Sequence, residues 1–403
     1  MIPVALLALL TLQPTGEIAR GYQDVVPAAQ SGGATAPPTP AQAAKQAEDE
    51  ARHKRDVEND IKIGKEYSAD VDKETKPSED KANIERVQRI GGELAKIANA
   101  TPIQALWGDK RMSRFEYNFK VIQGKDVNAF SLPGGTIYVY DGLVKYVESD
   151  DELAGVLAHE ISHASLRHVA TLQREQSKLN IIQLPLLLLT LLSGRPEALM
   201  TGSLLSNAIG SGWSVKAEQA ADFGGFQYMV QSKYNPTGLL TFMERLARDE
   251  RMEPSIDWGI YRTHPPGRER AESLESFMKT YNIPIRRSMV TSTFKTTVQP
   301  GEKASLDILF GKRKLFTLGG STAIARSDKA VQNLNAFFDS QPQMFEMTVT
   351  DDGWVMGRRQ GLLKLEPEDA AAADIGFDAY RADALKQMRA AIFTLSYRIW
   401  NSR

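Results

Sequence analysis

The chain has 403 residues, enough for roughly two to three domains, each with a substantial core. Its 49 basic and 50 acidic residues nearly cancel, and no segment has the basic bias of a nucleic-acid-binding protein, so we expect no nucleic-acid partner. It has no cysteine, which excludes disulfides, cysteine-rich zinc folds and cysteine nucleophiles. Any metal must therefore be bound by histidine, aspartate or glutamate.

The N-terminus carries an apolar run over residues 1–12, too short to span a bilayer but typical of the core of a signal peptide. No lysine or arginine precedes it, and a buried or disordered terminus is the alternative. We expect a signal peptide over residues 1–20 and hence an extracytoplasmic protein, periplasmic or secreted. Residues 21–47 are rich in proline, alanine, glycine and glutamine, which predicts a disordered linker.

A helical segment opens the predicted folded part. Residues 48–72 are highly charged with few apolar positions, which indicates an exposed helix. Apolar residues at three- and four-residue spacing over 84–97 predict a second helix. From Phe115 to Val121 apolar and polar residues alternate, which is typical of a half-buried strand.

An interrupted strand follows. Pro133-Gly134-Gly135 breaks an extended stretch, which predicts extended pieces at 128–131 and 136–140. A strand beside such an irregular piece can leave an unpaired edge that an extended peptide joins by main-chain hydrogen bonds. An ordinary β-hairpin accounts for the same residues equally well, and the spacing does not choose between the two.

Three of the five histidines fall within ten residues, in a predicted helix running from Asp151 to His168. His159 and His163 are four residues apart and so share one face of that helix. Glu160 lies between them, where a carboxylate can act on a metal-activated water. His168 is nine residues from His159, about 180° round a continuous helix, so we expect a structural or supporting role for it.

A catalytic zinc site needs a third protein ligand, with the fourth position left for water. Glu218, in a predicted helix through Val230, is the best candidate, and Asp222 lies one turn later on the same face. Asp222 could accept the free ring N–H of a ligating histidine. Alone, these two acids would indicate a solvated helix face, but beside the histidine pair they predict a site for one Zn²⁺.

Two further segments have open interpretations. His264, on a proline-bounded loop, is either a donor to the developing oxyanion or a histidine satisfied within a loop or core. Residues 179–192 are apolar but contain Pro185 and fall short of a membrane span. We expect a buried helix or a lid there, and a peripheral contact with a membrane or an envelope complex is the alternative.

The last part of the chain, residues 288–403, predicts a separate α+β domain without a catalytic constellation. Its expected elements are strands at 292–298, 305–310 and 314–318, a helix at 328–338, a hairpin at 345–356 and an amphipathic terminal helix. Asp352-Gly353 marks the hairpin turn.

Four motifs over about residues 80–280 resemble, in their order, the gluzincin zinc metallopeptidases of the HtpX-like and BepA-like group. The motifs are Asn128-Ala129-Phe130 with Pro133-Gly134-Gly135, His159-Glu160-Ile161-Ser162-His163, Glu218 to Asp222, and Thr263-His264-Pro265-Pro266 with Arg270. The resemblance implies a zinc-dependent enzyme with protein or peptide substrates.

The resemblance also implies a role for each matching residue. It makes His159, His163 and Glu218 the zinc ligands, Glu160 the catalytic base, Asp222 a supporting carboxylate, His264 an aid to the transition state or a cap on the metal, Arg270 a neighbour of the site, and Asn128, Ala129 and Phe130 the substrate-binding edge.

This chain differs from members of that group in two ways, and the differences restrict the function that we expect. Its membrane members have several spans, which this chain lacks, and BepA-like members carry helical repeats, whereas residues 288–403 predict strands. We expect the soluble exported branch: an endopeptidase for unfolded or misassembled envelope proteins. A chaperone-like or scaffolding protein with a capped, structural zinc site is the alternative.

The expected fold is α+β, with a mostly helical zincin-type domain at 48–287, a small β-sheet whose edge binds substrate, and the C-terminal domain.

Overall fold

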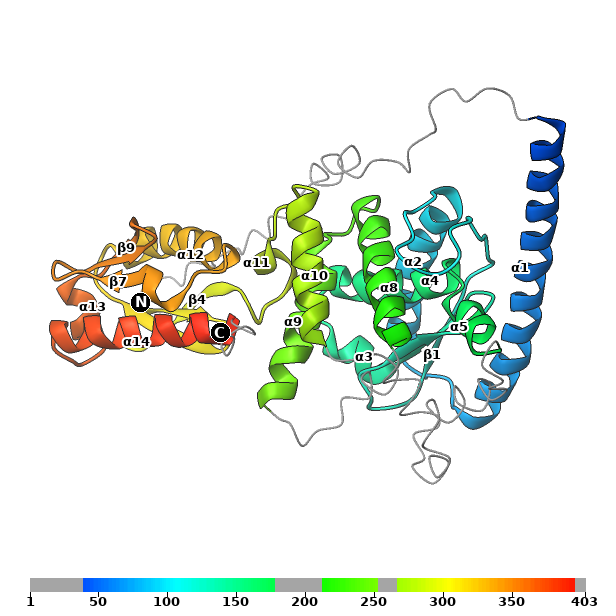
Figure 1. Cartoon of the computed structure of the whole chain (residues 1–403). Coiled ribbons are helices and arrows are strands. Elements are labelled where there is room, and N and C mark those ends of the chain that lie inside the picture. Colours follow the sequence, from blue (N-terminus) through cyan, green and yellow to red (C-terminus); the bar gives the residue numbers. More distant parts are fainter. Residues whose placement is uncertain (1–38, 178–211, 253–266, 396–403) are drawn as a thin grey trace.

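The computed structural model describes residues 39–177, 212–252 and 267–395. A mostly helical body holds the chain up to about residue 290, and a smaller α+β body follows it (Figure 1). The predicted α+β class is therefore confirmed. The predicted signal peptide and residues 179–192 lie outside the described residues. Among the described helices, none is long and apolar enough to cross a membrane.

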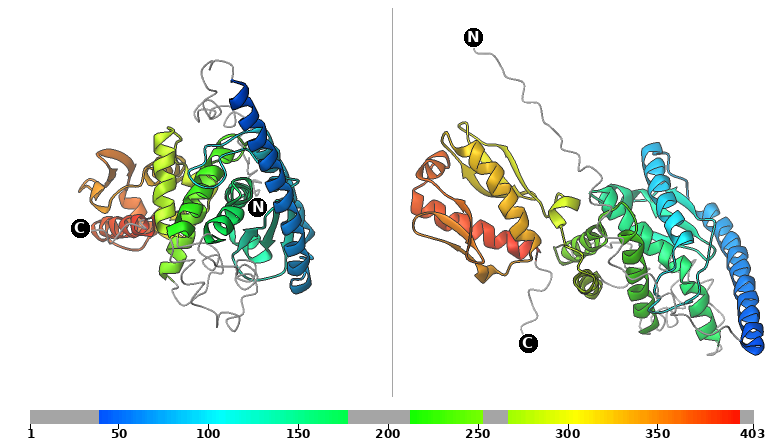
Figure 2. Two further views of the ribbon diagram at one scale, coloured as in Figure 1. Left: turned by 45° about the vertical axis from the view of Figure 1, so that its right-hand side comes forward. Right: turned by 90° about the horizontal axis from the view of Figure 1, so that it is seen from above.

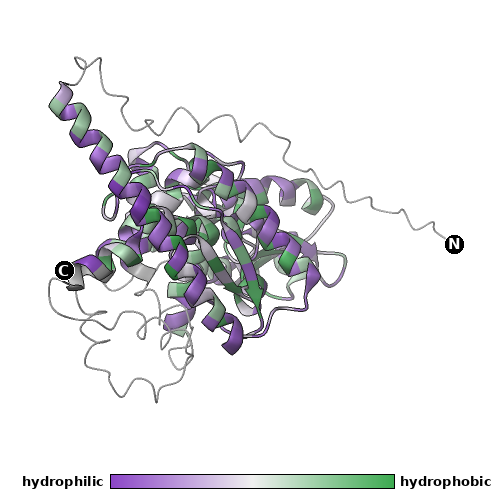
Figure 3. Cartoon of the chain, turned by 90° about the vertical axis from the view of Figure 1, so that its right-hand side faces the viewer, coloured by the Kyte–Doolittle hydropathy of each residue, from purple (hydrophilic) through white to green (hydrophobic). Residues whose placement is uncertain are grey.

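Helix α1 (Pro40–Glu74) begins inside the predicted linker, so residues 40–47 are helical and the expected boundary at residue 47 is wrong. The sequence has a helix start here: Thr39 and Gln42 form a capping box, and Pro40 occupies the first turn. The helix lies along the outside of the larger body, and its N-terminal part extends beyond it with a largely polar surface (Figure 3). At Gly64 it touches the Pro133 carbonyl so closely that a Cβ would not fit.

Helix α4 (Asp150–Ser165) lies at the centre of the larger body, and nearly all of its residues are buried. It begins where Ser149 accepts a hydrogen bond from the Glu152 amide, and acidic residues fill its first turn, which suits the helix dipole. It packs against α2, α8 and α9. The surrounding helices are α2 (Lys81–Ala100), α3 (Asp141–Tyr146), α5 (His168–Ser177), α8 (Gly212–Val230), α9 (Thr237–Met252) and α10 (Gly267–Thr280).

A three-stranded sheet packs beside these helices, in the order β1-β3-β2. Strands β1 (Asn118–Ile122) and β3 (Thr136–Tyr140) are parallel, whereas β2 (Ala129–Ser131) pairs antiparallel with β3. Strand β1 starts three residues later than the alternation from Phe115 predicted. Both interpretations of the interrupted strand hold in part, because β2 and β3 form a hairpin and β2 is also an edge strand of the described sheet.

The smaller body repeats one arrangement: a three-stranded antiparallel sheet followed by a helix. The first unit is β4 (Thr296–Pro300), β5 (Leu306–Phe310), β6 (Arg313–Leu318) and α12 (Ala323–Asp339). The second is β7 (Met347–Val349), β8 (Trp354–Gly357), β9 (Gln360–Lys364) and α14 (Phe377–Leu395), with η4 (Met344–Glu346) before β7 and α13 (Pro367–Ala372) before α14. The two units enclose one apolar core. The sequence did not predict β9 or α13.

The two bodies meet at α11 (Arg287–Val290), so the predicted boundary at residue 288 falls inside a short helix. The buried Arg287 guanidinium contacts Glu244 of α9 at 2.6 Å and Glu275 of α10 at 2.9 Å, and donates to the Asp339 carbonyl of α12. The smaller body and α1 lie at opposite ends of the molecule (Figure 2).

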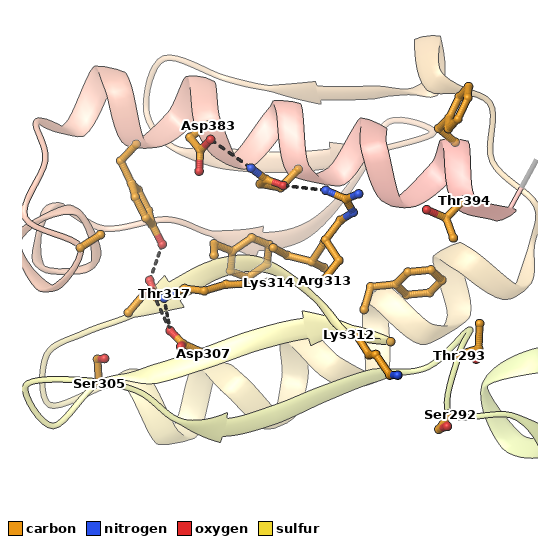
Figure 4. Close-up of a pocket in the computed structure, with 18 of the residues that line it drawn as sticks. Ser292, Thr293, Ser305, Asp307, Lys312, Arg313, Lys314, Thr317, Asp383 and Thr394 are labelled. Atoms are coloured by element: carbon orange, nitrogen blue, oxygen red, sulfur yellow. Dashed lines mark hydrogen bonds and ion pairs between the residues drawn. The ribbon is translucent and has the colours of Figure 1, made fainter. Parts of the chain in front are cut away.

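A cavity of about 1290 Å³ lies between the two bodies, lined by the end of α9, the β5–β6 hairpin and α14 (Figure 4). Its wall includes both basic and acidic residues, such as Arg313 and Asp383. None of the predicted metal ligands lines it, so this cavity is separate from the predicted site.

Candidate metal centre

The two histidines of α4 face the same point. Because the helix is regular from Asp150 to Ser165, His159 and His163 project from one face, as their spacing predicted. Their Nε2 atoms are 3.0 Å apart. Burial lowers the pKa of His163, which favours the neutral imidazole that binds metals.

Glu218 of α8 completes the cluster. Its carboxylate oxygens lie 3.4 Å from His159 Nε2 and 3.4 Å from His163 Nε2. Zinc bonds of about 2.0 to 2.1 Å in a tetrahedral arrangement separate neighbouring donor atoms by about 3.3 Å. The three groups therefore have the chemistry and the spacing of a tetrahedral zinc site, and they are the only such cluster found among the described residues.

Asp222 and Arg270 lie behind two of these groups. Asp222 Oδ1 is 2.9 Å from His159 Nδ1, which is the contact predicted from the sequence. Arg270 donates two hydrogen bonds of 2.7 and 2.8 Å to Asp222, and its Nη1 lies 3.1 Å from Glu218 Oε2. Burial alone would raise the pKa of Asp222, but the charge of Arg270 and the hydrogen bonds from Arg270 and His159 together lower the pKa to about 2. The ionised carboxylate can thus hold the Nδ1–H of His159 and leave Nε2 for a metal.

Glu160 follows His159 on α4 and is 2% exposed. Its charge contributes to the raised pKa of Arg270, although the charges of Asp222 and Glu218 contribute more to it. It also acts on His163 in the direction opposite to burial. The carboxylate of Glu160 therefore lies within electrostatic range of the cluster.

Helix α4 does not continue to His168, which corrects the expected geometry. It ends at Ser165, Arg167 adopts a left-handed φ of 55°, and α5 begins at His168. The break turns His168 back, so that its Nδ1 lies 2.9 Å from His163 Nδ1. Sequence reasoning placed His168 on the far side of a continuous helix and missed this contact, because neither glycine nor proline marks the break.

The predicted substrate-binding residues Asn128, Ala129 and Phe130 are all buried, and β2 packs against α4. Tyr140 donates to the Asn128 carbonyl and Leu132 to the Thr136 carbonyl. The main-chain N–H and C=O groups of successive residues in an antiparallel pair point alternately toward and away from the partner strand. Those of Ala129 and Ser131 therefore point away from β3.

Ser131, at the end of β2, lines the same small cleft as His163, so this end of β2 lies near one residue of the cluster. His264 lies outside the described residues, and its role stays a prediction.

Comparison with known proteins agrees with this geometry. The sequence profile of peptidase family M48 matches residues 84–278, which run from α2 to α10 and contain the whole cluster. The beta-barrel assembly-enhancing protease of Yersinia pestis is 28% identical over 245 residues, covering 58% of this chain and 44% of that protein. The metalloprotease LoiP of Escherichia coli is 30% identical over 166 residues, covering 41% of this chain and 64% of that protein.

A eukaryotic protein is also similar. The mitochondrial metalloendopeptidase OMA1 of Schizosaccharomyces pombe is 30% identical over 168 residues, or 41% of this chain and 48% of that protein. The chain thus spans less than two thirds of the length of each of these relatives. The resemblance predicted from the motifs is confirmed at the level of the family: the chain contains a domain of peptidase family M48, a family of zinc-dependent metallopeptidases.

Proposed function

We propose that the chain is a zinc-dependent endopeptidase whose metal is held by His159, His163 and Glu218. The convergence of these three groups at tetrahedral spacing, inside the domain that matches family M48, is the observation that carries the proposal. Zinc in such a site would act as a Lewis acid that lowers the pKa of water and polarises a peptide carbonyl.

Each side chain around the cluster has its own proposed role in the reaction. Glu160 takes the proton of the attacking water and returns it to the leaving amine. Asp222 fixes the ring of His159, and Arg270 balances the charge of the two buried carboxylates, Asp222 and Glu218. His264 is the proposed donor to the oxyanion or cap on the metal.

The substrate is proposed to bind as an added strand along β2. The main-chain groups of Ala129 and Ser131 point away from β3, and a peptide paired with them would run beside His163. Main-chain pairing selects extended, unfolded polypeptide and not a particular sequence, so unfolded or misassembled proteins are the proposed substrate class.

We further propose that the chain acts outside the cytoplasm, on envelope proteins. The support is the apolar run at residues 1–12 and the similarity to the Yersinia pestis relative, which is named a beta-barrel assembly-enhancing protease. Fusing residues 1–47 to an alkaline phosphatase that lacks its own signal should give active phosphatase. An inactive, cytoplasmic fusion protein would contradict export.

Casein cleavage by the full chain tests the activity. The wild type should bind one zinc and cut casein, whereas Glu160→Gln should keep its zinc and lose about 10²- to 10⁴-fold in rate, since it lacks the acid/base group. Glu302→Gln is the matched control, because Glu302 is exposed in the smaller body. Equal rates for Glu160→Gln and the control would refute the assigned role.

The second candidate is a chaperone-like or scaffolding protein with a capped, structural zinc site. The deep burial of His159 and Glu218, at 3% and 4% exposure, favours it, because a closed site needs no access for substrate. If zinc binds stoichiometrically but neither the wild type nor His264→Ala cuts casein, this second function replaces the peptidase.

A further inference from the structure

The corner between α4 and α5 brings a third histidine against the metal cluster. Arg167 is the residue that turns the chain, with a left-handed φ of 55° that costs a non-glycine residue free energy. Such a conformation persists only where its surroundings hold it. The contacts that hold it also fix the ring of His168, which is 1% exposed.

The ring nitrogens of His163 and His168 form a series of hydrogen bonds that all donate in the same direction, toward the Trp107 carbonyl. His163 presents Nε2 to His159 and Glu218, so its Nδ1 carries the proton when the ring is a neutral metal ligand. His168 Nδ1 lies 2.9 Å from that Nδ1, and His168 Nε2 lies 3.3 Å from the Trp107 carbonyl. Since a carbonyl only accepts, His168 donates from Nε2, which leaves its Nδ1 free of a proton and able to accept from His163.

Helix α1 and the loop at Trp107 hold the corner in place. The buried Arg167 guanidinium contacts both carboxylate oxygens of Asp60 on α1, at 2.5 and 3.1 Å, and Asp109 at 2.9 Å. The Asp109 amide donates to the Leu166 carbonyl at 2.8 Å. These contacts connect α1 to Arg167, the residue before His168, and connect Arg167 to the loop that carries the Trp107 carbonyl.

We propose that His168 is a positioning residue that accepts the Nδ1–H of His163, and that Asp60 of α1 holds it in place through Arg167. His163 would then have in His168 what His159 has in Asp222: a partner that fixes tautomer and ring orientation. Residues 40–74 precede the match to family M48, so α1 would be an addition to that domain that acts on its metal site. The inference rests on the proposed zinc site but not on peptidase activity.

Zinc affinity of the full chain, measured by chelator competition, tests the proposal. His168→Leu should weaken zinc binding about 10- to 100-fold, the usual effect of removing such a partner. His168→Asn should restore most of the affinity, because the amide oxygen can occupy the position of Nδ1. Glu302→Gln is the control, since Glu302 is exposed in the smaller body and belongs to none of the contacts that hold this corner. Unchanged affinity in His168→Leu, or equal losses in the Leu and Asn variants, would overturn it.

A measurement on the wild type avoids variants that do not fold. In ¹⁵N-histidine spectra of the zinc-loaded chain, His163 should carry its proton on Nδ1 and His168 on Nε2. A proton on His168 Nδ1 would contradict the proposal. A chain that binds zinc with these tautomers but cuts no casein would refute the peptidase and leave the positioning role intact.

Discussion

The two bodies of the molecule use buried charge differently. In the peptidase domain, His159, Glu218, Asp222 and Arg270 are nearly inaccessible to solvent and converge on one point. In the C-terminal domain the buried Asp369 forms an ion pair with Arg326 and accepts a hydrogen bond from the Gly319 amide. These contacts connect α13 to the end of β6.

Buried charged groups can form a binding site, as in the larger body, or stabilise the fold, as in the smaller one. Asp369 is satisfied by its own neighbours. The peptidase cluster instead brings two imidazole nitrogens and a carboxylate together at 3.0 to 3.4 Å. Donor atoms of this kind at this separation suit a divalent cation.

The largest expected effect comes from removing a ligand. Glu218→Gln should lower zinc affinity more than the roughly 10- to 100-fold that loss of a supporting partner costs, and casein cleavage should fall to background. Asp307→Asn, which removes the charge that pairs with Lys314 in the C-terminal domain, should leave both unchanged. Zinc titration of the two purified variants measures the difference, and similar affinities would contradict the assignment of Glu218.

Much of this site could be predicted because it depends on local periodicity. The spacing of His159 and His163, and of Glu218 and Asp222, fixes a shared helix face before any tertiary contact is known. The C-terminal hairpin was likewise predicted from Asp352-Gly353, and Gly353 adopts φ 93°.

The rest depends on contacts or turns without a local signature. The β8–β9 turn places Arg358 and Arg359 at φ 46° and 69°, where glycine or asparagine is usual, so β9 gave no signal. Helix α4 ends just before Arg167, whose side chain contacts Asp60, 107 residues away in the sequence. Periodicity does not reveal such a contact.

Two buried arginines, Arg270 and Arg326, each neutralise buried carboxylates in one of the two bodies. Arg270→Met leaves Asp222 and Glu218 buried without their cation, and Arg326→Met does the same to Asp369, so each should cost about 3–5 kcal/mol of unfolding free energy. Only Arg270→Met should also change zinc affinity. Urea unfolding and zinc titration of both variants measure these effects, and altered zinc binding in Arg326→Met would remove the distinction between the two regions.

A smaller effect is expected at the junction, and it depends on pH. Burial would raise the pKa of Glu148, but hydrogen bonds from Thr291 and Thr293 and the charge of Arg245 lower it to about 2. A carboxyl group with a lowered pKa stabilises the folded state above its unfolded pKa, near 4.5, and this contribution is lost as the pH falls toward 2. The stability difference between wild type and Glu148→Gln should therefore shrink between about pH 4 and pH 2. A difference that stays constant over that range would contradict this assignment.

The smallest expected effect is at the start of α4. Ser149→Ala removes the side-chain oxygen that caps the Glu152 amide and should cost about 1 kcal/mol. Zinc affinity should not change, because the cluster lies more than two turns further along the helix. Thermal unfolding with and without zinc measures both quantities, and a loss of zinc binding would show that the helix transmits changes at its end to the site.

The most direct test of the central claim is anomalous diffraction at the zinc edge from crystals of the zinc-loaded chain. We predict one peak, within about 2.0 to 2.2 Å of His159 Nε2, His163 Nε2 and a Glu218 oxygen. A zinc peak ligated by other residues, or no peak in crystals of protein shown to contain zinc, would contradict it.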